Sequence, residues 1–284
     1  MKISAELAGV PVGEGCPVRI MGVINVSPES FFKGSVHVRA NSIKVAARRM
    51  TEDGADFIDV GAMSTAPYLK TQISEKDEAE RLGWAVRIIR KHTRLPISID
   101  TSRPLPALEG LKAGGKILND VRGLAGDSAM PGLAKKFSGV ILMAHPASIF
   151  SPFPKRDKHN PMATVTGILR RNLKLALGAG VSRSRIVIDP GIGFFRNEKW
   201  PWWAWDLEIL RELKKLRALH QPILIGVSRK SFIGHFTGAL PDERLAGSLA
   251  ATTAAVLNGA SIVRTHDVRE TREAVRVAES FISV

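Results

Sequence analysis

The sequence predicts a single (β/α)8 barrel, the TIM-barrel form of the α/β class. Eight short apolar runs recur along 284 residues, helical patterns lie between them, and several of these helices end in glycine just before the next run. We expect residues 1–17 to form a lead-in that covers the barrel bottom, and 18–284 to form the barrel domain. A doubly wound open sheet is the alternative, but it normally carries a glycine-rich phosphate loop after its first strand, and residues 23–28 do not form one.

The predicted strands are rich in β-branched and other apolar residues, as in parallel sheets that are buried on both faces. They cover 18–26, 57–62, 96–100, 117–121, 140–145, 185–189, 222–227 and 261–264. Helical spacing of apolar residues appears at 45–50, 79–89, 168–177, 209–219 and 245–257. The helix-ending glycines include Gly54, Gly114, Gly180 and Gly259. Glycine suits such positions because it adopts the left-handed conformation without a Cβ penalty.

Composition excludes several classes of protein. The single cysteine, Cys16, rules out a disulfide framework and a cysteine-rich metal site, and it fits a reducing compartment. No apolar run reaches the roughly 18 residues that a membrane span needs, and the N-terminus lacks the order of a signal peptide. We therefore expect a cytoplasmic protein with no membrane partner.

The net charge is strongly positive, because 41 Lys and Arg stand against 27 Asp and Glu to give +14. The basic residues are spread over the predicted helices rather than gathered in a block, and no helix-turn-helix, zinc-finger or RNA-binding signature accompanies them. We therefore expect no nucleic-acid partner. Attraction of an anionic small substrate, or a solvated basic surface, explains the charge better.

Polar residues lie at or just after the C-terminal end of every predicted strand. They are Asn25, Ser64, Thr65, Asp100, Asn119, Asp120, His145, Asp189, the segment 228–231 (SRKS), Arg264, His266 and Asp267. In this type of barrel the active site gathers at the C-terminal ends of the strands. Turn caps account for some of these residues, and we interpret Asp59 and Asp120 as caps or strand-end hydrogen bonders. His145 fits either role. All eight ends together are difficult to explain by capping alone.

The chemistry of these side chains indicates binding rather than covalent attack. Asp100, Asn119 and Asp189 supply acceptors and amide groups that suit a nitrogen-rich heterocycle. Lys230, Arg264 and His266 supply cationic donors for phosphate oxygens or a ring carbonyl. The sequence contains no serine nucleophile elbow, HExxH motif or paired-histidine spacing, so we expect no covalent nucleophile.

An ordered series of motifs resembles the dihydropteroate synthase family over residues 20–280. The series is 21–31 (MGVINVSPESF), 54–61 (GADFIDVG) with Ser64 and Thr65, 99–101 (IDT), 119–121 (NDV), 189–194 (DPGIGF), 228–231 (SRKS) and 264–267 (RTHD). Each motif alone is weak, but the set in this order is specific. The resemblance implies a transferase that joins 6-hydroxymethyl-7,8-dihydropterin diphosphate to an aryl amine such as p-aminobenzoate and releases pyrophosphate.

The resemblance also implies the site residues. Asp100, Asn119, Asp189 and Lys230 would bind the pterin; Asn25, Arg264 and His266 would bind the pyrophosphate; Thr65, Pro67 and Ser231 would bind the amine. Asn25 would also ligate Mg2+, which keeps most of its waters and takes phosphate oxygens, so one protein ligand is physically reasonable. The family resemblance further implies a homodimer.

The segment that would meet the amine departs from the family pattern. Where the family has an arginine after Ser-Thr, this chain has Ala66. One hypothesis keeps p-aminobenzoate, with Lys33 or Arg196 compensating for that arginine. The other has a ribosylated, phosphorylated aminobenzene of the methanopterin-type pathways as the amine, and the positive charge mildly favours it.

Two readings of another class stay open. A corrinoid-linked pterin methyltransferase shares the barrel, but it needs no pyrophosphate clamp, so Lys230, Arg264 and His266 count against it. A non-catalytic pterin-binding paralogue would bind the pterin diphosphate without turnover. The tryptophan-rich segment 200–205 (WPWWAW) is interpreted as helix packing or a subunit interface rather than a ligand-stacking lid.

Overall fold

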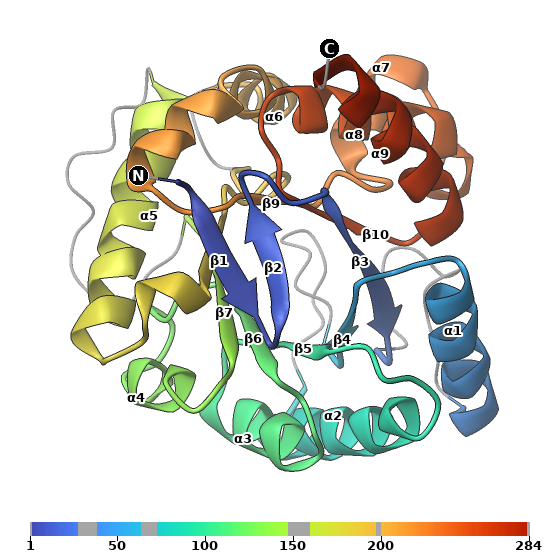
Figure 1. Ribbon diagram of the computed structural model, residues 1–284, viewed down its shortest axis with the longest axis vertical. Coiled ribbons are helices and arrows are strands. Elements are labelled where there is room, and N and C mark those ends of the chain that lie inside the picture. The colour runs from blue at the N-terminus through green and yellow to red at the C-terminus, as the bar shows by residue number, and fades with distance from the viewer. Residues whose placement is uncertain (1, 28–38, 64–72, 147–159, 197–199, 283–284) are drawn as a thin grey trace.

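A closed barrel of parallel strands forms the centre of the molecule. The computed structural model describes residues 2–27, 39–63, 73–146, 160–196 and 200–282. Eight parallel strands are hydrogen-bonded in the order β8-β7-β6-β5-β4-β3-β10-β9. A parallel bridge between Ile188 and Ile223 joins the two ends of this sheet, and the Ile188 amide donates to the Pro222 carbonyl at 3.0 Å. This closure confirms the predicted (β/α)8 barrel and excludes the open sheet (Figure 1).

The strands agree closely with the predicted apolar runs. They are β3 (Arg19–Asn25), β4 (Phe57–Gly61), β5 (Ile97–Asp100), β6 (Ile117–Asp120), β7 (Gly139–Met143), β8 (Ile186–Asp189), β9 (Leu224–Ile225) and β10 (Ile262–Thr265). The helices are α1 (Ala40–Glu52), α2 (Glu75–Arg90), α3 (Pro104–Lys112), α4 (Met130–Ala134), α5 (Pro161–Gly178), α6 (Trp202–Arg211), α7 (Ser231–Thr237), α8 (Leu245–Leu257) and α9 (Val268–Ile282), with short 3-10 segments η2 (Arg183–Arg185), η3 (Leu213–Leu219) and η4 (Pro241–Glu243). None of these helices is long and apolar enough to cross a membrane.

Residues 4–13 form a hairpin across the N-terminal end of the barrel. Strands β1 (Ser4–Leu7) and β2 (Val10–Gly13) pair antiparallel around Ala8 and Gly9, both of which have positive φ, as two-residue hairpin turns require. Leu7 and Val12 are fully buried. They pack on the inward-facing apolar layer of the barrel, which consists of Met21, Phe57, Ile117, Ile141, Val187, Leu224 and Ile262. The domain boundary at residue 17 stays a prediction.

The strand period places a polar layer directly above this apolar one. Successive side chains on a strand point to opposite faces, so residues two apart share a face. Asp59 therefore lies one step above Phe57 in β4, and Arg264 lies one step above Ile262 in β10. The interior of the barrel thus changes from apolar near the hairpin to charged near the C-terminal ends of the strands.

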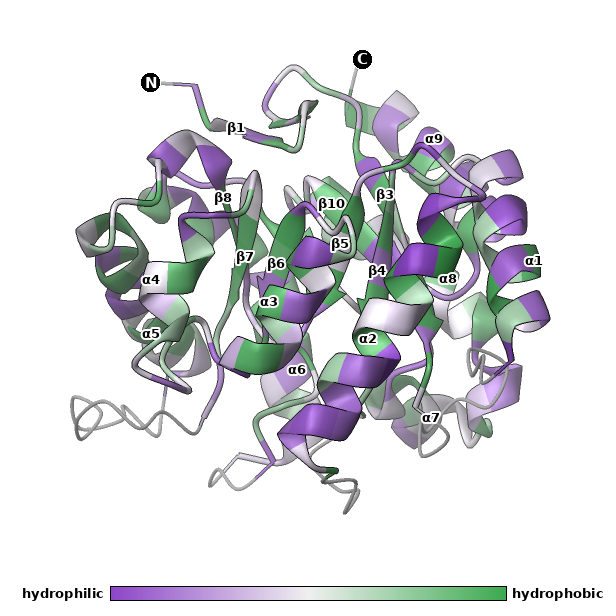
Figure 2. Cartoon of the chain, turned by 90° about the horizontal axis from the view of Figure 1, so that it is seen from below, coloured by the Kyte–Doolittle hydropathy of each residue, from purple (hydrophilic) through white to green (hydrophobic). Residues whose placement is uncertain are grey.

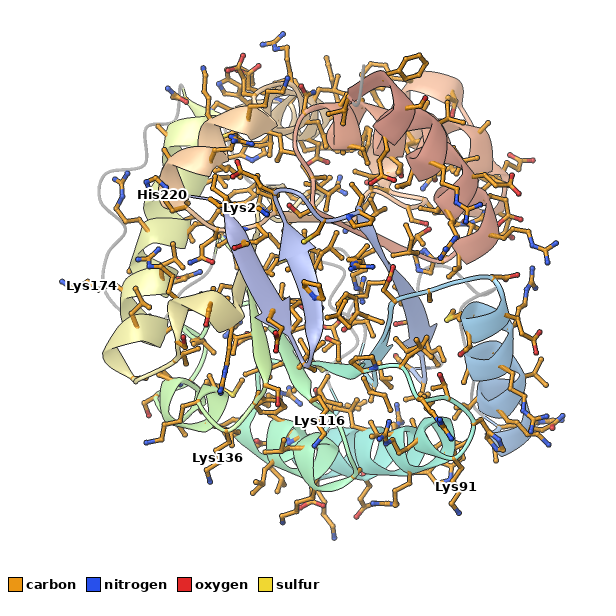
Figure 3. The ribbon with its side chains drawn as sticks, in the orientation of Figure 1. Lys2, Lys91, Lys116, Lys136, Lys174 and His220 are labelled. Carbon is orange, nitrogen blue, oxygen red and sulfur yellow. The ribbon has the colours of Figure 1, made fainter. Side chains whose placement is uncertain are left out.

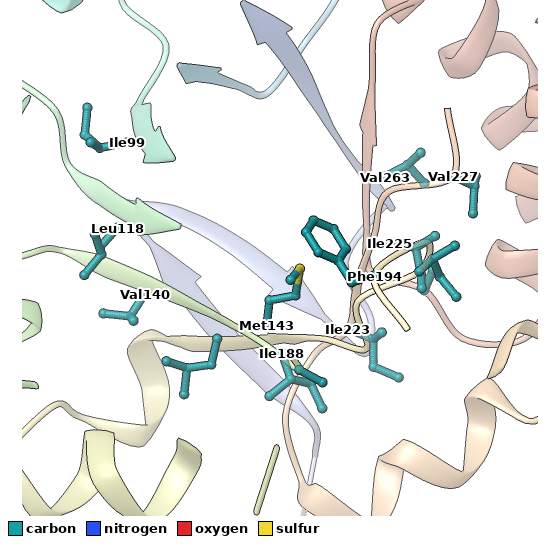
Figure 4. Close-up of a cluster of buried hydrophobic side chains, with 14 of the residues drawn as sticks. Ile99, Leu118, Val140, Met143, Ile188, Phe194, Ile223, Ile225, Val227 and Val263 are labelled. Carbon is teal, nitrogen blue, oxygen red and sulfur yellow. The ribbon is translucent and has the colours of Figure 1, made fainter. Parts of the chain in front are cut away.

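The outward faces of the strands pack against the ring of helices. Leu118, Val140, Ile188 and Val263 belong to this larger core (Figure 4). Figure 2 shows the helices turning apolar faces toward the sheet and polar faces outward. Exposed basic residues such as Lys91, Lys116, Lys136 and Lys174 lie at separate points around the molecule (Figure 3).

Helix α2 illustrates how the sequence sets these elements. Ser74 accepts a hydrogen bond from the Asp77 amide at 3.0 Å and so caps the first turn, which is acidic, while the last turn is basic. Leu82 and Ile89 are fully buried on its inner face. The capping residue, the charge order and the apolar spacing all specify the same helix.

The prediction of one helix over 209–219 is wrong at its second half. Helix α6 ends at Arg211, and the chain continues as the 3-10 segment η3 to a left-handed residue, His220. Leu213, Leu216 and Leu219 recur every third residue, which is the period of a 3-10 helix, and all three are buried. The apolar period therefore favours the tighter helix here.

Candidate active site

Four of the predicted pterin and pyrophosphate residues come together inside the barrel. Asp100, Asn119, Asp189 and Arg264 stand near the ends of β5, β6, β8 and β10. Asp100 pairs in register with Asn119 on the next strand. The three acceptor residues are at most 9% exposed. The structure thus brings together residues that are up to 164 positions apart in the sequence.

Arg264 is the centre of this polar layer. Its Nε donates to Asp59 Oδ2 at 2.7 Å, and its Nη2 donates to Asp100 Oδ2 at 2.9 Å. Burial alone would lower the pKa of Arg264, but the charges of the two carboxylates outweigh burial and raise that pKa. Asn119 Nδ2 lies 3.2 and 3.3 Å from the two oxygens of Asp59. Asp59 is therefore a hydrogen bonder, as predicted, but it stands in the middle of β4 rather than at a strand end, and its carboxylate orients two site residues.

Asp100 keeps one acceptor atom without a partner. Its Oδ1 is buried and makes no hydrogen bond within the described residues, whereas Oδ2 accepts from Arg264. Burial, followed by the charge of Asp59, raises the pKa of Asp100 to about 7 in spite of Arg264. A buried acceptor without a donor is costly, so this oxygen is suited to an N–H group of a ligand.

Asp189 is held at the start of a glycine turn. The Gly191 amide donates to Asp189 Oδ1 at 2.8 Å. Gly191 has φ +76°, and a Cβ atom there would lie 2.2 Å from the Ala144 carbonyl oxygen, so only glycine fits. Burial raises the pKa of Asp189 to about 6. The turn thus fixes a carboxylate in a dry, poorly solvated position.

Lys230 faces Asp189 from the loop after β9. Burial, followed by the charge of Arg264, lowers the pKa of Lys230 to about 8. Its Nζ lies 4.8 Å from the centre of the Phe194 ring, which is a favourable cation–π contact. His145 meets the same ring edge-on at 5.8 Å.

Sequence reasoning missed Asp206, a second carboxylate close to Lys230. Asp206 in α6 is 1% exposed, and its Oδ1 accepts from the Gly193 amide at 2.8 Å, while Oδ2 has no hydrogen-bond partner within the described residues. Burial raises its pKa to about 6. The available signal was an acidic residue on the apolar face of a helix, between the buried residues Trp205 and Ile209.

Two of the predicted amine-binding residues, Thr65 and Pro67, lie outside the described residues, as do Ser64, Lys33 and Ala66. Ser231, the third, accepts a hydrogen bond from Arg196 Nη2. Arg196 Nε donates to the Gly193 carbonyl at 2.9 Å, and its Cζ lies 4.1 Å from the centre of the Trp202 ring.

The charge state of His266 differs from the prediction of a cationic donor. Its Nδ1 lies 3.0 Å from Ser228 Oγ. Burial, together with the charges of Arg264 and Arg229, lowers the pKa of His266 to about 3. The prediction of a cationic histidine is therefore wrong for the free protein: the ring is neutral at physiological pH and donates from one nitrogen only.

Two further predictions can be compared with the structure. Asp120 accepts from Ser102, at 2.5 Å, and from the amides of Arg122 and Leu124, so it caps the turn after β6 as predicted.

In the tryptophan-rich segment, Trp205 is 1% exposed and stacks on Phe195 with ring centres 4.9 Å apart. This confirms helix packing for Trp205.

Comparison with known proteins agrees with this geometry. The family model described as "Pterin binding enzyme" matches residues 21–266. Dihydropteroate synthase of Escherichia coli K12 is 35% identical over 267 residues, which cover 93% of this chain and 92% of the relative. The chain belongs to the dihydropteroate synthase family. Dihydropteroate synthase of Neisseria meningitidis is 36% identical over 279 residues, with the same coverage of each chain.

Solved dihydropteroate synthase structures have the same fold. The Coxiella burnetii enzyme in complex with pteroic acid has a TM-score of 0.86 at 34% identity, over 99% of both chains. The Xanthomonas albilineans enzyme with 4-aminobenzoic acid has a TM-score of 0.85 at 32% identity, over 100% of both chains. Membership of the dihydropteroate synthase family makes this chain an enzyme, and its class is that of the pterin-binding transferases.

Proposed function

We propose that the chain condenses 6-hydroxymethyl-7,8-dihydropterin diphosphate with p-aminobenzoate. The amine nitrogen attacks the methylene carbon, the bond from that carbon to the diphosphate oxygen breaks, and pyrophosphate leaves. The observation that carries this proposal is the row of buried acceptors, Asp100, Asn119 and Asp189, beside Lys230 in a polar layer closed below by apolar side chains. The pteroic acid and 4-aminobenzoic acid bound to relatives support it.

The pterin would lie across the polar layer. Its amino-pyrimidine edge presents adjacent N–H donors, which suit the Asp189 carboxylate and the unpartnered Oδ1 of Asp100. Lys230 is positioned to donate to a ring carbonyl or nitrogen. Pterin binding would replace water at groups whose charged forms are poorly solvated in the free protein, so these contacts contribute strongly to affinity.

Arg264, His266 and Asn25 would bind the leaving pyrophosphate. Arg264 brings a charge that is fixed in orientation by Asp59 and Asp100. The neutral His266 ring can donate one hydrogen bond without adding charge. A loose transition state with cationic character at the methylene carbon requires positioning and electrostatic stabilisation rather than a covalent nucleophile.

Mg2+ fits the oxygen ligands present at this rim. Asn25 Oδ1 and Asp100 Oδ2 lie 3.4 and 3.5 Å from the point where a Cβ atom would stand on Gly61, so both oxygens face the same space. The described part of the chain holds no group of three or more His, Cys, Asp or Glu that could bind a metal. Mg2+ needs no such group, because it takes phosphate oxygens and keeps waters. Asn25 would hold the ion, which would neutralise charge on the pyrophosphate.

We further propose a homodimer that acts in the cytoplasm. Phe236 in α7 and Leu240 shortly after this helix are 55% and 67% exposed. His235 and Trp203 stack on each other with ring centres 4.7 Å apart, and both rings meet the Phe236 ring edge-on. An exposed apolar patch of this kind supports an interface, and the single cysteine fits the cytoplasm.

Turnover of the purified chain with defined substrates tests the proposed function. The protein is incubated with the pterin diphosphate, Mg2+ and either p-aminobenzoate or the ribosylated, phosphorylated aminobenzene, and both pyrophosphate and the condensed pterin are measured. Product with p-aminobenzoate is expected. Product with the second amine alone would reassign the substrate, and binding of pterin diphosphate without any product would indicate the non-catalytic paralogue. Methyl transfer from a methylated tetrahydropterin to a corrinoid would identify the methyltransferase.

A further inference from the structure

Two buried carboxylates hold the glycine turn that follows β8. The Gly191 amide donates to Asp189 Oδ1 and the Gly193 amide donates to Asp206 Oδ1, each at 2.8 Å. Gly193 has φ +84°, and a Cβ atom there would stand 3.1 Å from Lys230 Cδ and 3.4 Å from Lys230 Nζ. The Lys230 side chain therefore passes close to the same turn that binds the two carboxylates.

The two carboxylates differ in their access to a ligand. Asp189 ends a barrel strand and is 9% exposed, whereas Asp206 comes from α6 and is 1% exposed. Asp206 Oδ2 is buried and has no hydrogen-bond partner within the described residues. A buried carboxylate is costly unless a cation lies near it. Asp206 is thus too deeply buried to meet a substrate, but its charge can act on Lys230.

The charges around Lys230 come from four elements of the fold. They belong to Asp206 from α6, Asp189 from β8, Arg196 from the loop after β8, and Arg264 at the end of β10, with the neutral His266 just beyond it. Burial, followed by the charge of Arg264, lowers the pKa of Lys230 to about 8, and the charge of Asp206, ahead of that of Asp189, opposes this lowering. Burial raises the pKa of Asp206 to about 6, and the charge of Lys230 opposes that rise. Both groups are therefore charged between about pH 6 and pH 8.

We propose that Asp206 is a positioning residue for the pterin, because its carboxylate provides the negative charge that stabilises the Lys230 ammonium while Asp189 accepts hydrogen bonds from the ligand. Pterin N–H donors at Asp189 would disperse the charge of that carboxylate, whereas Asp206 lies out of the ligand's reach and keeps its charge for Lys230. This inference rests on the proposed function and adds to it a residue that acts through Lys230 without touching the substrate.

The pH dependence of pterin binding in Asp206→Asn tests the proposal. The amide keeps an oxygen acceptor for the Gly193 N–H, so the turn is retained. Calorimetry with 6-hydroxymethyl-7,8-dihydropterin should place the midpoint of the alkaline limb near pH 8 in wild type and about one unit lower in Asp206→Asn. Such a shift lowers the affinity about 5-fold at pH 8 but less than about 1.5-fold at pH 6.5, where Lys230 stays mostly protonated.

Two further variants separate this effect from a structural one. In Lys230→Arg the cation does not lose its proton in this pH range, so adding Asp206→Asn should change the affinity by the same factor at pH 6.5 and pH 8. Glu208→Gln is the matched control, because it removes another carboxylate of α6, one that pairs with the exposed Arg211. Its binding profile should match that of wild type.

Equal losses at pH 6.5 and pH 8 in Asp206→Asn would show that Asp206 only supports the turn, and unchanged affinity at both would show that it has no role; either result overturns the proposal. NMR titration of the Lys230 side chain in the ligand-free protein provides a measurement that is independent of substrate. Its midpoint should fall in Asp206→Asn and stay unchanged in Glu208→Gln. If wild type binds no pterin, the proposed function fails, and an unchanged midpoint in Asp206→Asn would then still refute the role of Asp206.

Discussion

Arg229 binds Asp267 through two parallel hydrogen bonds, from Nε to Oδ2 at 2.9 Å and from Nη2 to Oδ1 at 2.7 Å. The two side chains are 8% and 17% exposed. Arg229 also has a positive φ of 56° and donates from Nη1 to two backbone carbonyls of the 241–242 segment. The pair joins the loop that carries Lys230 to the loop that carries His266. It therefore sets the spacing between the proposed pterin and pyrophosphate contacts.

Arg229→Lys should destabilise the protein and weaken binding of the pterin diphosphate. Lysine cannot form the bidentate pair and leaves Asp267 poorly neutralised, so we expect a loss of about 2–4 kcal/mol in unfolding free energy. Chemical denaturation and the KM for the pterin diphosphate measure the two effects. Asp267→Asn should cost a similar amount, and the double variant less than the sum. Additive losses would show that the pair does not act as a unit. Arg269→Lys is the control, because Arg269 also pairs with an aspartate but is 70% exposed.

The strands could be predicted from the sequence because each carries its own local signal. Every strand that the structure shows in the barrel lies on a predicted apolar run, although β9 keeps only Leu224–Ile225 of the predicted 222–227. The closing bridge between Ile188 and Ile223 could not be predicted in this way, since it joins residues from opposite edges of the linear sheet. The alternation of strands and helices predicted a barrel. The particular contact that closes it depends on the arrangement of the whole sheet, which no single strand reveals.

The site was predictable where a residue's position on a strand decides its role. Asp100, Asn119 and Asp189 follow from strand ends. Arg264 was predicted as a phosphate ligand, but its two carboxylate partners are 205 and 164 residues away in the sequence and were not predicted. The neutral state of His266 depends on burial among cations, which no local pattern reveals.

Asp59→Asn should lower the pKa of Asp100 and reduce stability. The negative charge of Asp59 is one cause of the raised pKa of Asp100, so its removal lets Arg264 favour the ionised form of Asp100. Loss of one carboxylate from a buried ion pair should cost about 3–5 kcal/mol of unfolding free energy. Carboxyl NMR titration of Asp100 and denaturant unfolding measure the two effects. An unchanged Asp100 titration would contradict the coupling. Asp53→Asn is the control, because it also removes a carboxylate from an ion pair, but the partner arginine, Arg269, is exposed.

Binding of 6-hydroxymethyl-7,8-dihydropterin should be strongest between about pH 7 and pH 8. Asp189 and Asp100, with pKa values raised to about 6 and about 7, become protonated as the pH falls and lose their acceptor capacity. Lys230, with its pKa lowered to about 8, loses its proton above that pH. His266, with its pKa lowered to about 3, stays neutral over this pH range, so its titration does not change the binding affinity. Calorimetric titration across pH 5–9 measures the profile. In Lys230→Arg the alkaline limb should disappear, and its persistence would assign that limb to another group.

Asp189→Asn should abolish pterin binding and leave the fold intact. The amide keeps an acceptor for the Gly191 N–H but offers an N–H to the ligand where two N–H donors must be accepted. The folded pKa of Asp189, about 6, exceeds its unfolded value, so ionisation costs stability as the pH rises through 6. The variant should therefore unfold at or above the wild-type temperature at pH 8, with a smaller difference at pH 5. Asp206→Asn is the control, because Asp206 is also buried and its pKa is also raised to about 6; this variant should gain similar stability yet retain measurable affinity. Wild-type pterin affinity in Asp189→Asn would refute the assignment.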